Sequence, residues 1–159
     1  MYATDSMPIL FKVALIHAQF ETIHPFLDGN GRMGRLLITF ILCQKQILNK
    51  PLLYLSHFFK QNRTQYYEHL QRIHDTGSWE DWLKFFLRGV FVVAQEATLT
   101  AHKIVQLRER HRIIIAKQFR RSGGAANDLL ERLYKRPIVT VNDVARITGQ
   151  TYSNANQLV

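Results

Sequence analysis

Glycine and proline interrupt this chain rarely, and the runs between them are long. The 159 residues include 8 glycines and 4 prolines, and 47% of the residues are hydrophobic. Long runs rich in Leu, Ile, Phe, Gln, Lys and Arg favour helices over strands. The sequence therefore predicts an all-α protein, long enough to bury one core of real size.

Hydrophobic spacing and the few breakers set the expected elements. Pro25 and Gly29 predict a loop at 23–30, and Gly77 predicts a second break. Gly149 predicts a tight turn between two short helices, which is a helix-turn-helix pattern. We expect helices over residues 9–22, 31–44, 52–61, 64–74, 79–119, 128–135, 141–148 and 152–159.

A run of small residues, Ser122-Gly123-Gly124, predicts the boundary between two parts. We expect a catalytic core at 1–121, a linker at 122–126 and a partial helix-turn-helix segment at 127–159. Both ends of the sequence look cut, because the chain runs directly into one helix and stops within another. We therefore expect a piece of a longer protein.

The net charge of +9 suits anionic partners such as nucleotide phosphates, nucleic acid or acidic protein surfaces. Much of this charge lies in Lys103–Arg121, which is either a solvated helix face or a nucleic-acid patch. The single cysteine, Cys43, cannot form an internal disulfide, and we expect it to be a small buried apolar residue. No signal peptide or stretch of membrane-spanning length occurs, so we expect a cytoplasmic protein with no membrane partner.

The segment from His24 to Arg35 carries a set of residues suited to phosphate chemistry. Gly29 and Gly31 flank Asn30 where a loop becomes a helix, so backbone N–H groups and the helix N-terminus can surround an anion. Arg32 and Arg35 are three residues apart and share one side of the first turn. Two guanidinium groups beside such a nest suit a polyphosphate.

Two upstream side chains complete the set. Asp28 precedes the nest, and a lone carboxylate beside phosphates is a usual ligand of Mg²⁺. His24 lies four residues earlier, where a neutral imidazole can take a proton from an attacking hydroxyl. Together these residues indicate phosphoryl or nucleotidyl transfer.

Two other motifs in the same residues are rejected. The glycines at 29, 31 and 34 fit a dinucleotide-binding fingerprint, but no strand precedes them. The spacing of Gly29 and Gly34 fits a P-loop, but Arg35-Leu36 stands where Lys-Ser/Thr is needed.

The same segment resembles the Fic motif, His-x-Phe-x-Asp/Glu-Gly-Asn-Gly-Arg-x-x-Arg, without departure. The flanks resemble Fic proteins too, over roughly residues 10–121, and the tail is similar to the winged-helix segment that many of them append. The resemblance implies a Fic-type helical core followed by a truncated winged-helix-like segment.

The family implies a role for each motif residue. His24 is the expected general base, Asp28 the Mg²⁺ ligand, and Phe26 a core residue that anchors the loop. The anion nest consists of Gly29, Asn30 and Gly31, while Arg32 and Arg35 clamp the β- and γ-phosphates. By the same resemblance, Asn62, Tyr66 and Tyr67 lie near the base and ribose.

The implied activity is protein adenylylation: AMP moves from Mg-ATP to a Ser, Thr or Tyr hydroxyl of a target protein. The family's β-hairpin flap and inhibitory helix are missing, so weak transfer is expected from this piece. The alternative is a DNA-binding regulator whose core only senses nucleotide. The tail serves either DNA reading or protein interaction, and interaction is favoured because no Arg or Lys follows Thr151. Its candidate contact residues are Tyr152, Ser153, Asn154 and Gln157. The oligomeric state is left open, a homodimer included.

Overall fold

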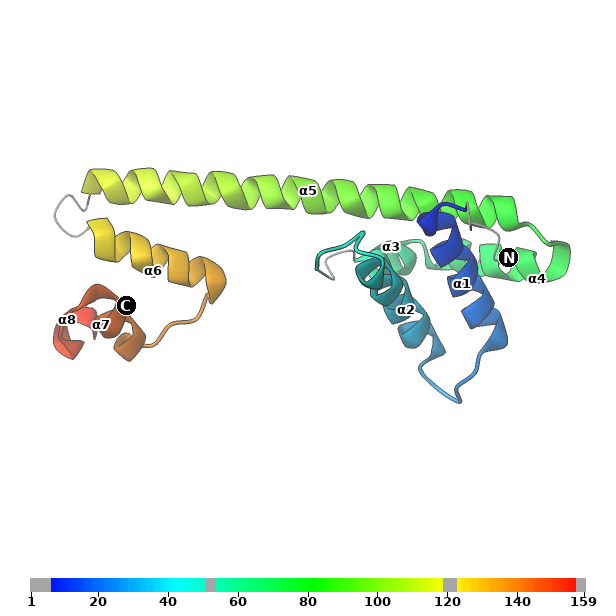
Figure 1. Cartoon of the computed structure of the whole chain (residues 1–159), viewed down its shortest axis with the longest axis horizontal. Helices are drawn as coiled ribbons and strands as arrows, with labels where there is room; N and C mark the ends of the chain where they lie inside the picture. The colour runs from blue at the N-terminus through cyan, green and yellow to red at the C-terminus, as the bar shows by residue number, and fades with distance from the viewer. Residues whose placement is uncertain (1–6, 51–53, 119–122, 157–159) are drawn as a thin grey trace, which may run out of the picture. The chain divides into compact units, whose positions relative to one another are not determined.

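Helices account for every regular element in residues 7–50, 54–118 and 123–156, the ranges that the computed structural model describes (Figure 1). In chain order they are α1 (Ile9–Ile23), α2 (Asn30–Gln44), α3 (Leu55–Gln61), α4 (Arg63–Thr76), α5 (Trp79–Gln118), α6 (Gly123–Lys135), α7 (Val141–Thr148) and α8 (Tyr152–Asn156). The prediction of an all-α fold is confirmed.

Most helix boundaries lie within two residues of those expected, but α3 begins at Leu55 rather than at 52, and α6 differs further. It begins at Gly123 rather than at Asp128, so residues 123–126 of the expected linker are helical. Two glycines cost a helix roughly 1 kcal/mol each, and the strong helix formers Ala125 and Ala126 follow them. The expected linker residue Ser122, and the predicted helix ends at 52, 119 and 159, lie outside the described residues.

By internal contacts the chain divides into two compact units, Met1–Thr100 and Ala101–Val159. The division falls within α5, between Thr100 and Ala101, rather than after residue 121. The functional assignment of each part remains a prediction.

Aromatic side chains from α3, α4 and α5 fill the core of the first unit. Trp82 and Phe86 of α5 are both 0% exposed, and Phe59 of α3 lies 6.4 Å and 6.2 Å from them between ring centroids. The indole N–H of Trp82 donates a 2.9 Å hydrogen bond to the carbonyl oxygen of Ala14 in α1. Each such buried ring stabilises the fold by roughly 1.5–3 kcal/mol. The aromatic core therefore fixes where α1 lies.

Helices α1 and α2 pack side by side and are joined by a short loop at one end (Figure 1). Their buried residues recur at helical spacing: Val13, Ala14, His17 and Ala18 in α1, and Asn30, Gly34, Ile38 and Leu42 in α2. The loop between them is residues 24–29, the part of the sequence in which the phosphate chemistry was predicted. Two packed helices thus hold this loop at their shared end.

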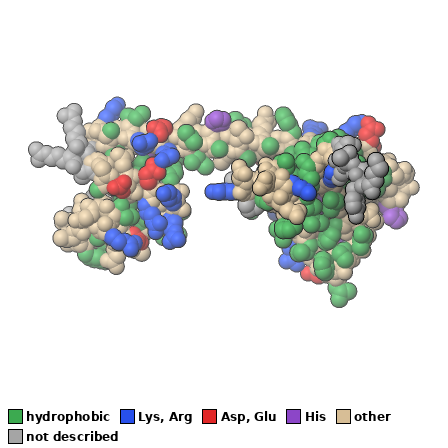
Figure 2. All heavy atoms as spheres, in the orientation of Figure 1, with side chains coloured by type: hydrophobic (Ala, Val, Ile, Leu, Met, Phe, Trp, Pro, Cys, Tyr) green, Lys and Arg blue, Asp and Glu red, His purple; other side chains and the backbone are tan. Residues whose placement is uncertain are grey.

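The first unit exposes apolar surface over α1 and α2, where Figure 2 shows hydrophobic side chains gathered. Two cavities of about 800 and 530 Å³ open there and share Phe20 and Leu37 in their walls. Their linings are mostly apolar, with Gln19 in the larger cavity and Thr39 in the smaller. None of the described helices is both long and apolar enough to cross a membrane.

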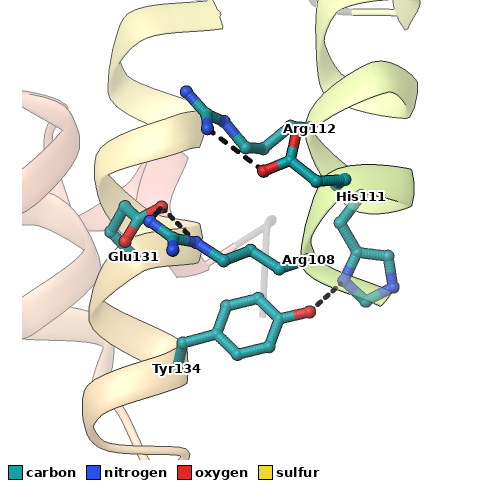
Figure 3. Close-up of polar contacts among 6 residues, drawn as sticks. Arg108, His111, Arg112, Glu131 and Tyr134 are labelled. Carbon is teal, nitrogen blue, oxygen red and sulfur yellow. Dashed lines mark hydrogen bonds and ion pairs between the residues drawn. The ribbon is translucent and has the colours of Figure 1, made fainter. Parts of the chain in front are cut away.

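In the second unit, two polar contacts join α5 to α6 (Figure 3). Arg108 donates to Oε1 of Glu131 from Nε at 2.9 Å and from Nη2 at 2.6 Å. The hydroxyl of Tyr134 lies 3.1 Å from Nδ1 of His111. These contacts fasten α6 along α5 within this unit.

The last two described helices, α7 and α8, are short, and α7 is capped at both ends. Thr140 and Asp143 form a reciprocal capping box at the start of α7, and Gly149 ends the helix with φ of 67°. Tyr152, Ser153 and Asn154 of α8 are exposed, and Gln157 lies outside the described residues. The assignment of this segment as a winged-helix-like module stays a prediction.

Candidate active site

The loop between α1 and α2 begins and ends with a left-handed residue. His24 ends α1 with φ 50° and ψ 56°, and its N–H donates to the carbonyl oxygen of Phe20 at 3.1 Å. Gly29 starts α2 with φ 84°, a conformation that glycine adopts without steric cost. Two reversals within six residues turn the chain from one helix directly into the next.

His24 is exposed at the end of α1, and its ring has a defined orientation. Nδ1 lies 3.4 Å from the carbonyl oxygen of Glu21. Because a carbonyl oxygen only accepts, this contact favours the tautomer with the proton on Nδ1. The Nε2 lone pair is then available to accept a proton from solvent or substrate.

Asp28 and Arg32 form an ion pair at the mouth of the loop. Their closest atoms, Oδ2 and Nη2, are 3.2 Å apart, and their side chains are 93% and 77% exposed. Such a pair adds little stability, so both groups can exchange partners at small cost. Within the described residues no three His, Cys, Asp or Glu side chains gather as a metal site, so Asp28 is a single carboxylate. Mg²⁺ often takes one protein carboxylate when phosphates supply other ligands, and Asp28 fits that arrangement.

The N-terminus of α2 is open to an anion. Among the described residues no side chain caps it, which leaves the first backbone N–H groups without helical partners. A Cβ at Gly31 would stand 3.0 Å from Nη1 of Arg35, and one at Gly29 would stand 3.5 Å from Nη2 of Arg32. The two glycines therefore leave room for both guanidinium groups to fold back over the first turn.

Asn30 holds the loop with its side chain. Its Oδ1 accepts the N–H of Phe26 at 2.9 Å, its Nδ2 donates to the carbonyl oxygen of Phe26, and the residue is 2% exposed. The expectation that the Phe26 ring points into the core is wrong: Phe26 is 49% exposed and its ring lies 6.3 Å from that of Phe20. The backbone of Phe26, rather than its ring, anchors the loop.

Three predicted site residues meet at one cavity. Arg35, Tyr66 and Tyr67 all line a hollow of about 320 Å³. Tyr66 is buried, with its hydroxyl 3.0 Å from Nε2 of His17, while Tyr67 is 54% exposed. The rest of the lining comes from Ser56, Phe59, Lys60 and Arg63. We call this hollow, lined by α2, α3 and α4, the cation pocket.

Asn62 lies at the junction of α3 and α4 and lines a different cavity, of about 560 Å³. Its Nδ2 donates to the carbonyl oxygen of Phe58 at 2.9 Å, which fastens the end of α3. The structure therefore brings Tyr66 and Tyr67 to Arg35 and separates Asn62 from that group.

Sequence reasoning missed a buried polar cluster behind the loop. His17 is 1% exposed between the rings of Phe59 and Trp82, and burial lowers its pKa to about 4. Its Nε2 lies 3.9 Å from Oε1 of Glu21, whose side chain is 11% exposed. Burial also raises the pKa of Glu21, against the opposing positive charge of Arg35. The sequence signal was a His and a Glu four residues apart on the helix side that faces α2.

Sequence reasoning also missed Lys60 and Arg63. Both line the cation pocket, and the guanidinium of Arg63 lies 5.7 Å from the ring centroid of Tyr67, within cation–π range. Nothing in their spacing from the motif indicates this, because they reach the pocket through the packing of α4 against α1 and α3.

The geometry agrees with comparisons to known proteins. Residues 1–42 match the family model of the Fic/DOC family. A probable protein adenylyltransferase of Aquifex aeolicus is 46% identical over 44 residues, which are 28% of this chain and 14% of that protein. The protein adenylyltransferase Fic of Drosophila grimshawi is 36% identical over 82 residues, which are 52% of this chain and 16% of that protein.

A longer but weaker match covers more of the chain. The protein adenylyltransferase Fic of Drosophila willistoni is 25% identical over 79% of this chain and 27% of that protein. This chain thus spans less than a third of the length of these curated relatives.

Proposed function

We propose that this chain is a protein adenylyltransferase, because residues 1–42 match the family model of the Fic/DOC family. The reaction transfers AMP from Mg-ATP to a Ser, Thr or Tyr hydroxyl of a target protein. One observation carries the proposal: the loop 24–29 presents an exposed imidazole, an exposed carboxylate and the open N-terminus of α2 together. The names of the relatives, protein adenylyltransferases, support the same activity.

In this proposal His24 is the general base. Its Nε2 takes the proton of the target hydroxyl while the hydroxyl oxygen bonds to the α-phosphorus. The bond between the α-phosphorus and the bridging oxygen of the β-phosphate breaks, and pyrophosphate leaves with that electron pair. The carbonyl oxygen of Glu21 keeps the Nδ1 proton in place, so the ring has one basic nitrogen to offer.

The start of α2 stabilises charge on the phosphates. Backbone N–H groups of Asn30 and Gly31 and the helix dipole favour a phosphate at this end. Arg32 and Arg35 add two guanidinium groups, each able to bind phosphate oxygens in pairs. Catalysis of this kind depends on positioning and charge neutralisation, so a small set of fixed groups suffices.

Asp28 is the residue that holds Mg²⁺ in this proposal. When bound, the ion neutralises phosphate charge and fixes the phosphates relative to the attacking oxygen. The Asp28 carboxylate lies beside Arg32 of the first turn of α2, where phosphates would bind.

Tyr66 and Tyr67 belong to the nucleotide side of the site, because they share a cavity with Arg35. Asn62 lines a different cavity and its amide donates to the carbonyl oxygen of Phe58, so the nucleotide contact expected of it stays a prediction.

The test is transfer of label from ATP labelled at the α-phosphate, with Mg²⁺, into a host lysate or the chain itself. Wild type is compared with His24→Ala and with the control His74→Ala, which removes an exposed histidine of α4. Label that requires His24 and Mg²⁺ but not His74 supports the proposal. Label from the γ-phosphate instead, or label that survives in His24→Ala, contradicts it.

The alternative, a DNA-binding regulator, draws less support from the second unit. Two arginines of the basic stretch are ion-paired, Arg108 with Glu131 and Arg112 with Glu109, which reduces the charge available to DNA phosphates. Figure 2 nevertheless shows Lys and Arg side chains gathered on this unit. Salt-dependent duplex binding that persists in His24→Ala would favour the alternative.

A further inference from the structure

We propose that the cavity of about 560 Å³ between α4 and α5 is a second binding site, and that its ligand is a short peptide of about three residues with both ends free. Such a peptide is a zwitterion, with an ammonium group at one end and a carboxylate at the other. We call this cavity the α4–α5 groove. The inference goes beyond the proposed function, because nucleotide transfer does not require it.

The floor of the α4–α5 groove is aromatic and closely packed. Phe58 of α3 and Phe85 of α5 line it, each residue is 7% exposed, and their ring centroids are 5.3 Å apart. A Cβ at Gly89 would stand 2.6 Å from the ring of Phe58, so that ring lies against the backbone of α5. The floor is therefore fixed before a ligand binds, and it suits an apolar or aromatic side chain.

The rim of the groove carries charges of both signs that are not paired within the protein. Glu68 and Arg72 of α4 line it, as do Asp81 and Arg88 of α5, and all four residues are exposed. Among the described residues none of these four side chains makes an ion pair. Glu68 and Arg72 stay apart although they stand one helical turn from each other, the spacing at which such side chains commonly pair. Two carboxylates and two guanidinium groups are thus available to a ligand.

This balance of charge argues against a simple anion as the ligand. The lining holds one further cation, Lys84, but its Nζ lies 2.7 Å from Oε1 of Glu80 and is already paired. The free guanidinium groups are therefore equalled in number by the carboxylates of the rim, which would repel a polyanion. A zwitterion can satisfy both kinds of group.

The spacing of the charges on α5 sets the length of the ligand. Asp81 and Arg88 are seven residues apart in the sequence, which is about 10 Å along the helix axis. An extended chain spans at most about 3.3–3.6 Å per residue, so three residues cover the same length. With the ammonium group at Asp81 and the carboxylate at Arg88, Glu68 is left as an acceptor for peptide N–H groups and Arg72 as a donor to peptide carbonyl oxygens.

His69 adds a buried polar atom to this site. It lines the groove, and its ring centroid is 4.9 Å from that of Phe85. Its Nδ1 is buried without a hydrogen-bond partner among the described residues. Leaving such an atom without a partner is costly, and a peptide group that bonds to it recovers the cost.

The groove and the cation pocket lie on opposite faces of α4. The helix contributes Arg63, Tyr66 and Tyr67 to the cation pocket and Gln65, Glu68, His69 and Arg72 to the groove. With 3.6 residues per turn, the centres of these two sets are about 160° apart around the helix. A peptide in the groove and a nucleotide beside Arg35 should therefore bind without competing.

The experiment titrates the tripeptide Ala-Phe-Ala into the whole chain without ATP and follows binding by NMR. We expect Asp81→Asn and Arg88→Gln each to weaken binding about tenfold, because each removes a charge-assisted hydrogen bond. Both positions are exposed, so neither substitution disturbs the core. The matched controls are Asp75→Asn in α4 and Arg110→Gln in the second unit, which change exposed residues outside the groove and should leave the affinity unchanged.

Modified peptides separate the contributions of the two ends. Acetylation of the N-terminus removes the ammonium charge, so it should weaken binding about tenfold and leave Asp81→Asn with no further effect. Amidation of the C-terminus should do the same with respect to Arg88→Gln. Ala-Ala-Ala should bind more weakly than Ala-Phe-Ala, because it has no ring to cover the aromatic floor.

Three results with these peptides would overturn the inference: no binding of Ala-Phe-Ala at millimolar concentration, undiminished binding of a peptide blocked at both ends, or undiminished binding in both rim variants. Label transfer from ATP does not depend on any of the three, so the proposed function stands or falls separately. Displacement of the peptide by Mg-ATP would also overturn the inference, because the nucleotide base would then occupy the groove, in agreement with the contact predicted for Asn62.

Discussion

Glu21 of α1 places its carboxylate oxygen Oε1 in the space that a side chain at Gly34 of α2 would need. A Cβ at Gly34 would also stand 3.1 Å from Phe20 and 3.2 Å from His17. The two helices that hold the loop thus approach closely at Gly34, and the residue after it is Arg35.

Gly34→Ala is expected to destabilise the first unit by about 1–3 kcal/mol, because the added methyl group must displace the Glu21 carboxylate and crowds the rings of Phe20 and His17. Chemical denaturation gives the change in free energy of unfolding. Gly124→Ala in α6 is the control: its Cβ meets open space, so alanine should stabilise that helix by about 0.5–1 kcal/mol. A neutral Gly34→Ala would contradict the expectation and mean that the side chains of Glu21, Phe20 and His17 accommodate the methyl group without loss of stability.

Glu21→Gln is expected to raise stability at neutral pH. The pKa of Glu21 is raised by burial, so the folded state binds its proton more tightly than the unfolded state does. The free energy of unfolding of wild type then falls as pH rises from 4.5, the ordinary pKa of a glutamate, through the raised pKa of Glu21. The Gln side chain does not ionise, so the variant keeps its stability over this range. Melting curves of both proteins over this range should diverge with increasing pH. A variant that is less stable than wild type at every pH would contradict the expectation.

His17 should make stability pH-dependent in the opposite sense. Burial lowers its pKa from 6.5 to about 4, so between these values the unfolded state binds the proton and the folded state does not. Stability should fall as pH falls from 6.5 to about 4, by up to about 3 kcal/mol from this residue. His17→Phe should show a flatter profile than wild type. His57→Gln, which changes an exposed histidine of α3, should keep the wild-type slope.

Asn30→Ala is expected to lower the free energy of unfolding by about 1–3 kcal/mol, since the buried N–H and carbonyl partners on Phe26 lose their hydrogen bonds. It should weaken ATP binding as well, because the loop that carries Asp28 is then unfastened. Arg32→Gln should weaken ATP binding without changing stability, since its ion pair is exposed. If Asn30→Ala changed binding but not stability, the amide would be a direct ligand instead.

The sequence predicted the helices and the loop well because both depend on local signals. Pro25 and Gly29 cannot continue a helix through the loop, and the motif residues from His24 to Arg35 stay together in space because they are neighbours in the chain. Residues farther along were harder to place. Asn62 and Arg63 are adjacent in sequence yet line different cavities, because at the α3–α4 junction their side chains lie on different sides of the backbone.

The exposure of Phe26 was unpredictable for a related reason. A phenylalanine in a tight loop is expected to hold the loop by burying its ring. Here the buried amide of Asn30 already holds the loop backbone through two hydrogen bonds, so the ring is not needed for this. Glu21 and His17 were missed because their significance depends on α2 packing against α1 at Gly34, which no local pattern reports.

The left-handed backbone of His24 has a consequence for anyone who engineers this chain. At φ 50° an L-residue pays about 1 kcal/mol or more that glycine would not. A library selected only for heat resistance should therefore enrich His24→Gly and discard the imidazole that the proposed chemistry needs. Screens for robust variants of this chain should fix position 24 beforehand, or score turnover in the same round.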